Sequence, residues 1–264
     1  MSLVLVFGLY LALGALAGTL AGLFGIGGGL VIVPVLIFSF GLQGISPEIA
    51  AHLAVGTSLA TIVFTSISSI RSHHQKGAVR WELFRPMVVG IVVGAALGAW
   101  TASLLSGEAL ELIIGVFVIL VALKMLLDIN PTTARPEPGK PLLSVAGTVT
   151  GWGSAIFGIG GGTLTVPFLS WRSVRMQQAV ATSAACGLPI AIAGAATNLW
   201  TGWGNPLLPD YAAGFVYLPA MVGIVATSVI FARFGAILAH KLDAKLLKRL
   251  FAILLLIVGT RFLL

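Results

Sequence analysis

A cluster of four glycines interrupts a long apolar run at two places in this chain. The first cluster is Phe24-Gly25-Ile26-Gly27-Gly28-Gly29 and the second is Phe157-Gly158-Ile159-Gly160-Gly161-Gly162. Glycine lowers helix stability and permits backbone angles that other residues rarely adopt, so each cluster is expected to break a helix. Amides and carbonyls freed inside a bilayer are tolerated only where protein packs on them or where they line a polar cavity. Paired breaks at matching places in two halves therefore point to the binding site of a transporter.

The composition places the whole chain in a membrane. Of its residues, 58% are hydrophobic and 9% are charged, and the mean hydropathy is +1.07, whereas about a quarter of a soluble domain is charged. The sequence thus predicts an all-α integral membrane protein. Its net charge of +7 resides in short loops, so we expect the lipid bilayer, and no nucleic acid, as a partner. The single cysteine, Cys186, excludes an internal disulfide.

The first apolar run is too long for one straight helix. Residues 3–41 would reach roughly 58 Å as a helix, against a hydrocarbon core of about 30 Å. We predict a hairpin with a longer arm over 3–23 and a shorter arm over about 30–40. Further spans are expected at about 49–70, 86–105 and 109–127, and then at 142–171 (broken), 178–202, 211–239 and 245–263. Gly90, Gly94 and Gly98 have the spacing of a helix-packing face.

The charges indicate that the two halves are inverted repeats. Residues 71–85 carry four cations, whereas the corresponding loop, 203–216, carries no Lys or Arg. Conversely, Gly41–Pro47 has no cation, whereas its counterpart carries Arg172 and Arg175. By the positive-inside rule, matching loops then lie on opposite sides. We predict transmembrane repeats over residues 1–128 and 142–264, each a glycine-broken helical hairpin plus three transmembrane helices. A cytoplasmic linker over 129–141 joins them, and both termini lie outside.

The breaks are expected to bind a small anion. A helix that begins inside the membrane presents unpaired amides and about half a positive charge, which holds an oxyanion without a buried arginine. Thr163 is expected to add a hydroxyl donor. Each of these residues also has a structural alternative. The glycines would allow tight helix crossing, and Asn198 would bond to a neighbouring helix. In the pairs Thr57-Ser58 and Thr182-Ser183, the hydroxyls would bond to carbonyls of their own helix. The candidate substrate-binding residues are Gly25, Gly27, Gly28, Gly29, Thr57, Ser58, Gly158, Gly160, Gly161, Gly162, Thr163, Thr182, Ser183 and Asn198.

The chain resembles the sulfite exporter TauE/SafE family of membrane permeases. The resemblance rests on the paired glycine clusters, each followed by a proline, and on a second pair of motifs. These are Ala54-Val55-Gly56-Thr57-Ser58 and Ala179-Val180-Ala181-Thr182-Ser183. It implies transport of small, often sulfur-containing anions, such as sulfite or sulfoacetate, across the cytoplasmic membrane.

Other functions remain open alternatives. A cation or metal-ion transporter would use the carbonyl ends of the same breaks, and a non-transporting accessory protein would need no polar cavity. An intramembrane enzyme would need clustered catalytic groups at depth, and the sequence offers none, so no catalytic residue, metal ligand or cofactor is predicted. The eight carboxylates all fall in loops or near segment ends, which argues against a proton relay of buried acidic residues. The coupling ion is then sodium or a proton carried by the substrate, or transport is coupled to no ion. A homodimer is also open.

Overall fold

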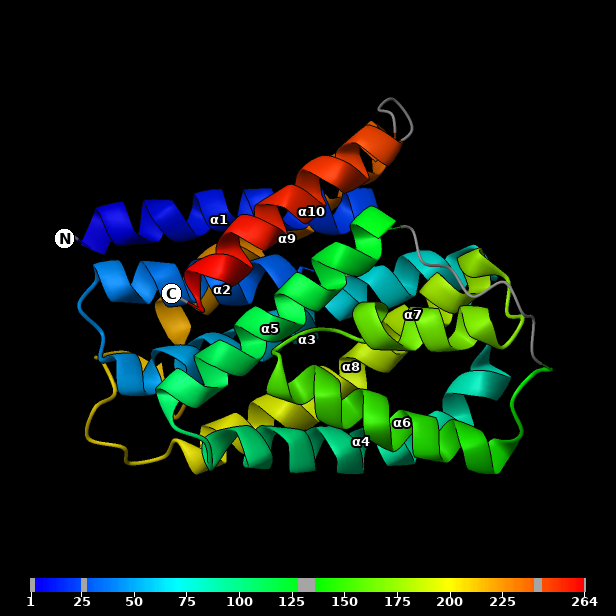
Figure 1. Cartoon of the computed structure of the whole chain (residues 1–264), viewed down its shortest axis with the longest axis horizontal. Helices are drawn as coiled ribbons and strands as arrows, with labels where there is room; N and C mark the ends of the chain where they lie inside the picture. The colour runs from blue at the N-terminus through cyan, green and yellow to red at the C-terminus, as the bar shows by residue number, and fades with distance from the viewer. Residues whose placement is uncertain (1–2, 25–27, 128–135, 240–243, 264) are drawn as a thin grey trace.

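The computed structural model describes residues 3–24, 28–127, 136–239 and 244–263, and this part of the chain is almost entirely helical (Figure 1). The helices are α1 (Leu3–Phe24), α2 (Gly29–Leu42), α3 (Pro47–Gln75), α4 (Trp81–Ser103), α5 (Gly107–Leu127), α6 (Lys140–Ile156), α7 (Gly162–Trp171), α8 (Met176–Thr201), α9 (Leu218–Ala239) and α10 (Ala244–Arg261). Four of them, α3, α4, α5 and α8, are long and apolar enough to cross a membrane by length and composition. The predicted all-α membrane protein is confirmed.

Both glycine clusters separate two helices, as predicted. In the first half, α1 ends at Phe24 and α2 begins at Gly29; Gly25 and Gly27 lie outside the described residues. In the second half, α6 ends at Ile156 and α7 begins at Gly162. Gly158, between them, has φ +62°, a left-handed conformation that glycine adopts without strain. Figure 1 shows that α2 and α7 begin near the middle of the molecule and run toward opposite ends.

The loops with many basic residues and the loops without them lie at opposite ends of the molecule. Figure 1 places both chain ends at one end of the molecule, together with the connections α2–α3 and α8–α9. At the opposite end lie the C-terminal end of α5, the N-terminal end of α6, and the loops that carry Arg80 and Arg175. The basic loops thus share one end of the molecule.

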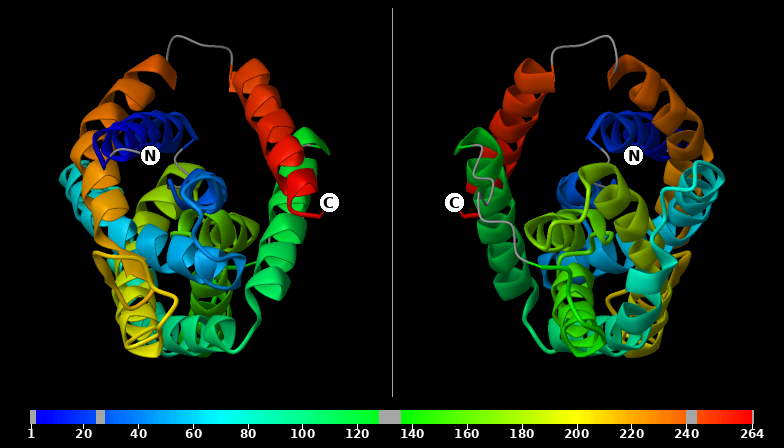
Figure 2. Two further views of the ribbon diagram at one scale, coloured as in Figure 1. Left: turned by 90° about the vertical axis from the view of Figure 1, so that its left-hand side faces the viewer. Right: turned by 90° about the vertical axis from the view of Figure 1, so that its right-hand side faces the viewer.

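Helices of the two halves pack closely through glycines. α1 lies along α9, and α4 lies along α6. A Cβ atom built on Gly94 would be 2.1 Å from the carbonyl oxygen of Thr148, and one built on Gly98 would be 2.2 Å from that of Trp152. The predicted packing face on α4 is confirmed. Figure 2 shows α1 with α9 on one side, α5 with α10 on the other, and α2 between them.

Two helix starts differ from the predictions. The expected span 211–239 begins only at Leu218, because a short antiparallel hairpin of β1 (Ala212–Ala213) and β2 (Val216–Tyr217) precedes it. Gly214, with φ +51°, forms the turn. In the other half, α4 begins at Trp81 rather than 86, and Glu82 in its first turn suits the positive end of a helix.

Candidate functional site

The two helix breaks are in direct contact. A Cβ atom built on Gly29, the first residue of α2, would lie 2.6 Å from the carbonyl oxygen of Gly158 and 2.8 Å from the Cα atom of Ile159. Any residue larger than glycine at position 29 would push the second break away. The structure thus brings together two predicted site residues, Gly29 and Gly158, that are far apart in the sequence.

Both short helices begin without a side-chain cap. Gly28 precedes α2 and Gly161 precedes α7, and neither start has a side-chain hydrogen bond. The first amide of α7 with a helical acceptor is that of Thr165, which donates to the Gly161 carbonyl at 2.8 Å. Within the described part of the chain, the amides of residues 29–30 and 162–164 have no acceptor. These starts therefore offer unpaired donors in the interior of the protein.

Three carbonyls at the second break have donors. The amide of Ile159 donates to the carbonyl of Ser154 at 2.9 Å, and the amide of Gly158 donates to that of Ala155 at 3.4 Å. The hydroxyl of Ser58, on α3, donates to the carbonyl of Gly158 at 2.7 Å. Among the described residues, the carbonyls that have no donor are those of Ile156, Phe157, Ile159 and Gly160, so the break leaves both amides and carbonyls unpaired.

Several buried hydroxyls surround the start of α7. Ser183, on α8, is fully buried, and its carbonyl oxygen would be 2.6 Å from a Cβ atom on Gly161. The hydroxyl oxygens of Ser183, Thr163 and Thr165 are buried, and none has a hydrogen-bond partner among the described residues. Thr165 was not predicted as a site residue, although the pattern Thr-Leu-Thr directly after the glycines was a signal for it.

Three other predicted residues make contacts away from the breaks. The hydroxyl oxygen of Thr57 accepts a 2.9 Å hydrogen bond from the amide of Tyr217, at the entry to α9. That of Thr182 accepts one of 3.0 Å from the amide of Arg80, at the entry to α4. The side chain of Asn198 donates to the carbonyl of Gly194 in its own helix. The sequence did not reveal that the two threonine hydroxyls accept hydrogen bonds from the amides that precede α9 and α4.

Gly160, another of the predicted glycines, has open space beside it. A Cβ atom on Gly160 would meet only Ile62, at 3.7 Å. This position therefore serves below as a control for substitutions that disturb packing.

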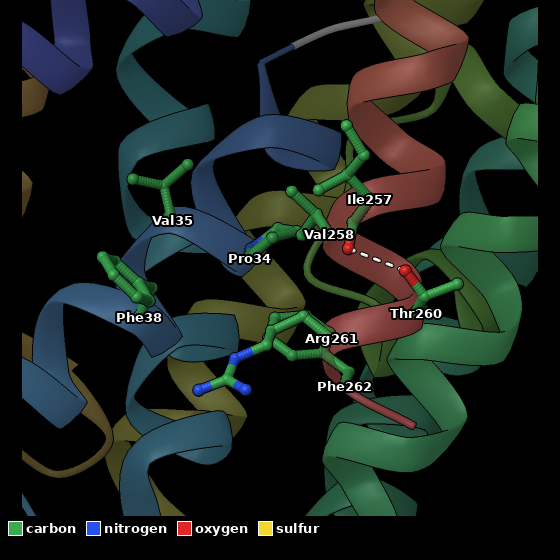
Figure 3. Close-up of a pocket in the computed structure, with 8 residues that line it drawn as sticks. All are labelled: Pro34, Val35, Phe38, Ile257, Val258, Thr260, Arg261 and Phe262. Atoms are coloured by element: carbon green, nitrogen blue, oxygen red, sulfur yellow. Dashed lines mark hydrogen bonds between the residues drawn. The ribbon is translucent and has the colours of Figure 1, made fainter. Parts of the chain in front are cut away.

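An apolar groove lies elsewhere in the described structure. A groove of about 450 Å³ runs between α2 and α10 (Figure 3), and its lining includes Pro34, Phe38 and Ile257. The hydroxyl of Thr260 donates to carbonyls of its own helix, and the side chain of Arg261 lies at the edge of the groove in Figure 3. Since this lining offers few polar groups, we assign the candidate site to the breaks and not to the groove.

The described residues offer no ready metal centre. They contain no group of three or more His, Cys, Asp or Glu side chains placed to hold a metal ion.

The architecture and the comparisons with known proteins agree. A bundle of apolar helices with discontinuous helices in its centre is typical of secondary membrane transporters. The family profile described as Sulfite exporter TauE/SafE matches residues 10–262. A probable membrane transporter protein of Haemophilus influenzae is 40% identical over 95% of this chain and 96% of its own length. A second, from Methanocaldococcus jannaschii, is 29% identical over 95% and 93%.

The chain belongs to the sulfite exporter TauE/SafE family, and it is a multi-pass membrane transporter. YunE of Bacillus subtilis, named as a probable membrane transporter protein, is 27% identical over 96% of each chain. No solved structure matches the chain.

Proposed function

We propose that this transporter moves small anions across the cytoplasmic membrane, and that its cargo is a sulfur-containing oxyanion or organosulfonate such as sulfite or sulfoacetate. The anion binds near the midplane, between the two broken hairpins, and reaches the two sides by alternating access. The positive-inside rule favours an orientation with both termini outside and the basic loops in the cytoplasm.

The observation that carries the proposal is the pair of uncapped helix starts at touching breaks. Gly29 lies against Gly158, so the first turn of α2 starts beside the second break. Each helix start carries roughly half a positive charge on its unpaired amides. In a site shielded from water such fixed dipoles act more strongly than at a surface. An anion would satisfy the amides that have no acceptor among the described residues.

A cation transporter is the alternative that the binding test decides. A cation site needs free carbonyl oxygens, as at the unwound segments of sodium-coupled transporters. At the second break the carbonyls of Ser154, Ala155 and Gly158 accept hydrogen bonds, whereas several others between them and α7 have no donor among the described residues. The test below therefore includes sodium as a probe.

We also infer that residues 1–128 and 142–264 are inverted repeats. Thr57 in the first motif accepts the amide at the entry to α9, and Thr182 in the second accepts the amide at the entry to α4. This reciprocal exchange supports an approximate twofold relation between the halves. A proton or sodium as coupling ion and a homodimeric assembly are compatible with this proposal.

Thermal stabilisation of the purified protein tests the anion site. A ligand at about a hundred times its Kd stabilises the native state by about 2.7 kcal/mol. The probes are sulfite, sulfate, thiosulfate, sulfoacetate and acetate, all as salts of one cation, with sodium chloride as the ionic control. We expect a shift with at least one sulfur oxyanion.

A matched pair of variants makes this test specific. Gly161→Ala forces a Cβ atom to 2.6 Å from the Ser183 carbonyl oxygen, whereas Gly160→Ala meets only Ile62 at 3.7 Å. The anion-induced shift should vanish in the first and persist in the second. A shift with sodium alone, or with none of the anions, would reject the proposal.

A further inference from the structure

We propose that the two breaks have different tasks: the second break, at the start of α7, binds the anion with its free amides and with the hydroxyls of Thr165 and Ser183. The first break, at the start of α2, supports it. This inference rests on the proposed function and assigns the contacts that recognise the cargo.

The first argument is an asymmetry between the two motifs. The glycine clusters are identical, but the residues after them differ: Leu30 and Ile32 in the first half correspond to Thr163 and Thr165 in the second. Leu30 and Ile32 are buried and cannot donate a hydrogen bond. Among the described residues, the start of α7 combines unpaired amides with hydroxyls, whereas the start of α2 presents apolar side chains at these two positions.

The second argument is the state of the two threonine hydroxyls. Elsewhere in these helices, buried or half-buried threonines donate to the carbonyl four residues earlier, as Thr61, Thr150 and Thr197 do at 2.8–2.9 Å. Thr163 and Thr165 have no such bond, nor any other hydrogen bond within the described ranges. Thr165 is fully buried, so its hydroxyl is shielded from bulk water. A buried hydroxyl without a partner is costly, which calls for a ligand.

The third argument is the direction of these side chains. In a helix every Cα–Cβ bond tilts toward the N-terminus, so a side chain covers the turn before its own Cα. Thr165 lies four residues after Gly161, so its side chain covers the first turn of α7, the turn that carries the free amides of residues 162–164. Thr163 lies two positions earlier and leaves the helix on another face, so it is not part of the proposed donor set.

Ser183 provides the same contrast from α8. Its counterpart, Ser58, donates to the carbonyl of Gly158 at 2.7 Å. The hydroxyl of Ser183 is fully buried and lacks a partner in the described structure. The backbone carbonyl of the same residue lies against Gly161. Ser58 therefore holds the second break by a hydrogen bond, whereas the hydroxyl of Ser183 is available to a ligand.

This donor set indicates the kind of anion. It is neutral, consisting of amides and hydroxyls around one helix start, so it recognises oxygen acceptors by number and direction and not by a countercharge. A sulfonate or sulfite group presents more acceptor oxygens than a carboxylate and uses more of these donors. We therefore expect sulfite and methanesulfonate to bind more tightly than acetate.

Conservative substitutions test the assignment by thermal-shift titration with sulfite, methanesulfonate and acetate. Thr165→Val and Ser183→Ala should weaken sulfite binding by at least about tenfold, since each removes a hydrogen bond to a charged group. The matched control, Thr150→Val, removes a buried hydroxyl that bonds to its own helix, and it should bind sulfite within about twofold of the wild type. Without ligand, Thr165→Val should melt at or above the wild-type temperature, because it removes an unpaired buried hydroxyl.

The outcomes separate this inference from the proposed function. If the wild type binds sulfite and Thr165→Val and Ser183→Ala bind it equally well, the assignment to the second break is wrong, while the anion site stands. If Thr165→Val lowers both binding and the melting temperature of the free protein, Thr165 serves packing, and the assignment is also wrong. If the wild type binds no anion, the proposed function itself fails.

Discussion

Replacing Gly29 by alanine tests whether the contact between the breaks is needed for transport. The added Cβ atom would lie 2.6 Å from the Gly158 carbonyl oxygen, where ordinary contacts begin at 3.4 Å. The two breaks would have to separate by about 0.8 Å, the difference between these values. The obstacle is backbone, so no side-chain rotation relieves it. Overpacking of this kind costs about 1–3 kcal/mol.

The effect on transport should exceed the effect on stability. A misplacement of about 1 Å in a binding constellation can reduce a rate by about a hundredfold. We therefore expect Gly29→Ala to insert and purify normally, with a modestly lowered melting temperature, and to lose most of its transport of radiolabelled sulfite in proteoliposomes.

Gly41→Ala, in the same helix but away from the break, is the matched control. A Cβ atom on Gly41 would meet nothing within 4 Å. We expect transport within a fewfold of the wild type. Full transport by Gly29→Ala, at a melting temperature equal to that of Gly41→Ala, would refute the argument that the breaks must touch.

Three further substitutions test a helix interface, a helix entry and an ion pair. Gly94→Ala would place a Cβ atom 2.1 Å from a carbonyl oxygen of α6, so it should destabilise the protein by about 1–3 kcal/mol in thermal unfolding, while Gly8→Ala, with nothing within 4 Å, should not. Thr57→Val should cost about 1–3 kcal/mol, because the buried amide at the entry to α9 loses its acceptor; an unchanged melting temperature would contradict this. Glu137→Gln should change stability by less than about 1 kcal/mol, because its ion pair with Arg80 is exposed, and the pKa of Arg80 stays raised by the carboxylate of Glu82; a larger loss would show that this pair fastens the linker.

The helix breaks could be predicted because their cause is local. Four glycines in an apolar run weaken a helix whatever surrounds them, so the ends of α1 and α6 follow from the sequence. The packing face on α4 has the same basis, since the spacing of Gly94 and Gly98 alone places them on one side of a helix.

The state of each hydroxyl could not be predicted, because it depends on tertiary neighbours. Ser58 and Ser183 occupy equivalent places in two similar motifs, yet only Ser58 meets a carbonyl, that of Gly158, which is 100 residues away in the chain. The hairpin before α9 was missed for a different reason. The dipeptides Ala212–Ala213 and Val216–Tyr217 are apolar and continue into α9, so composition alone cannot separate them from a helix.

The packing also limits which parts can move in alternating access. The pair α1–α9 joins a helix of the first predicted repeat to one of the second, and so does the pair α4–α6. Their glycines bring backbone against backbone, as at Gly14 against Ile224 and at Gly94 against Thr148. A motion that separated residues 1–128 from 142–264 as two bodies would have to break both interfaces. The pairs, and not the sequence halves, are therefore the units that stay intact.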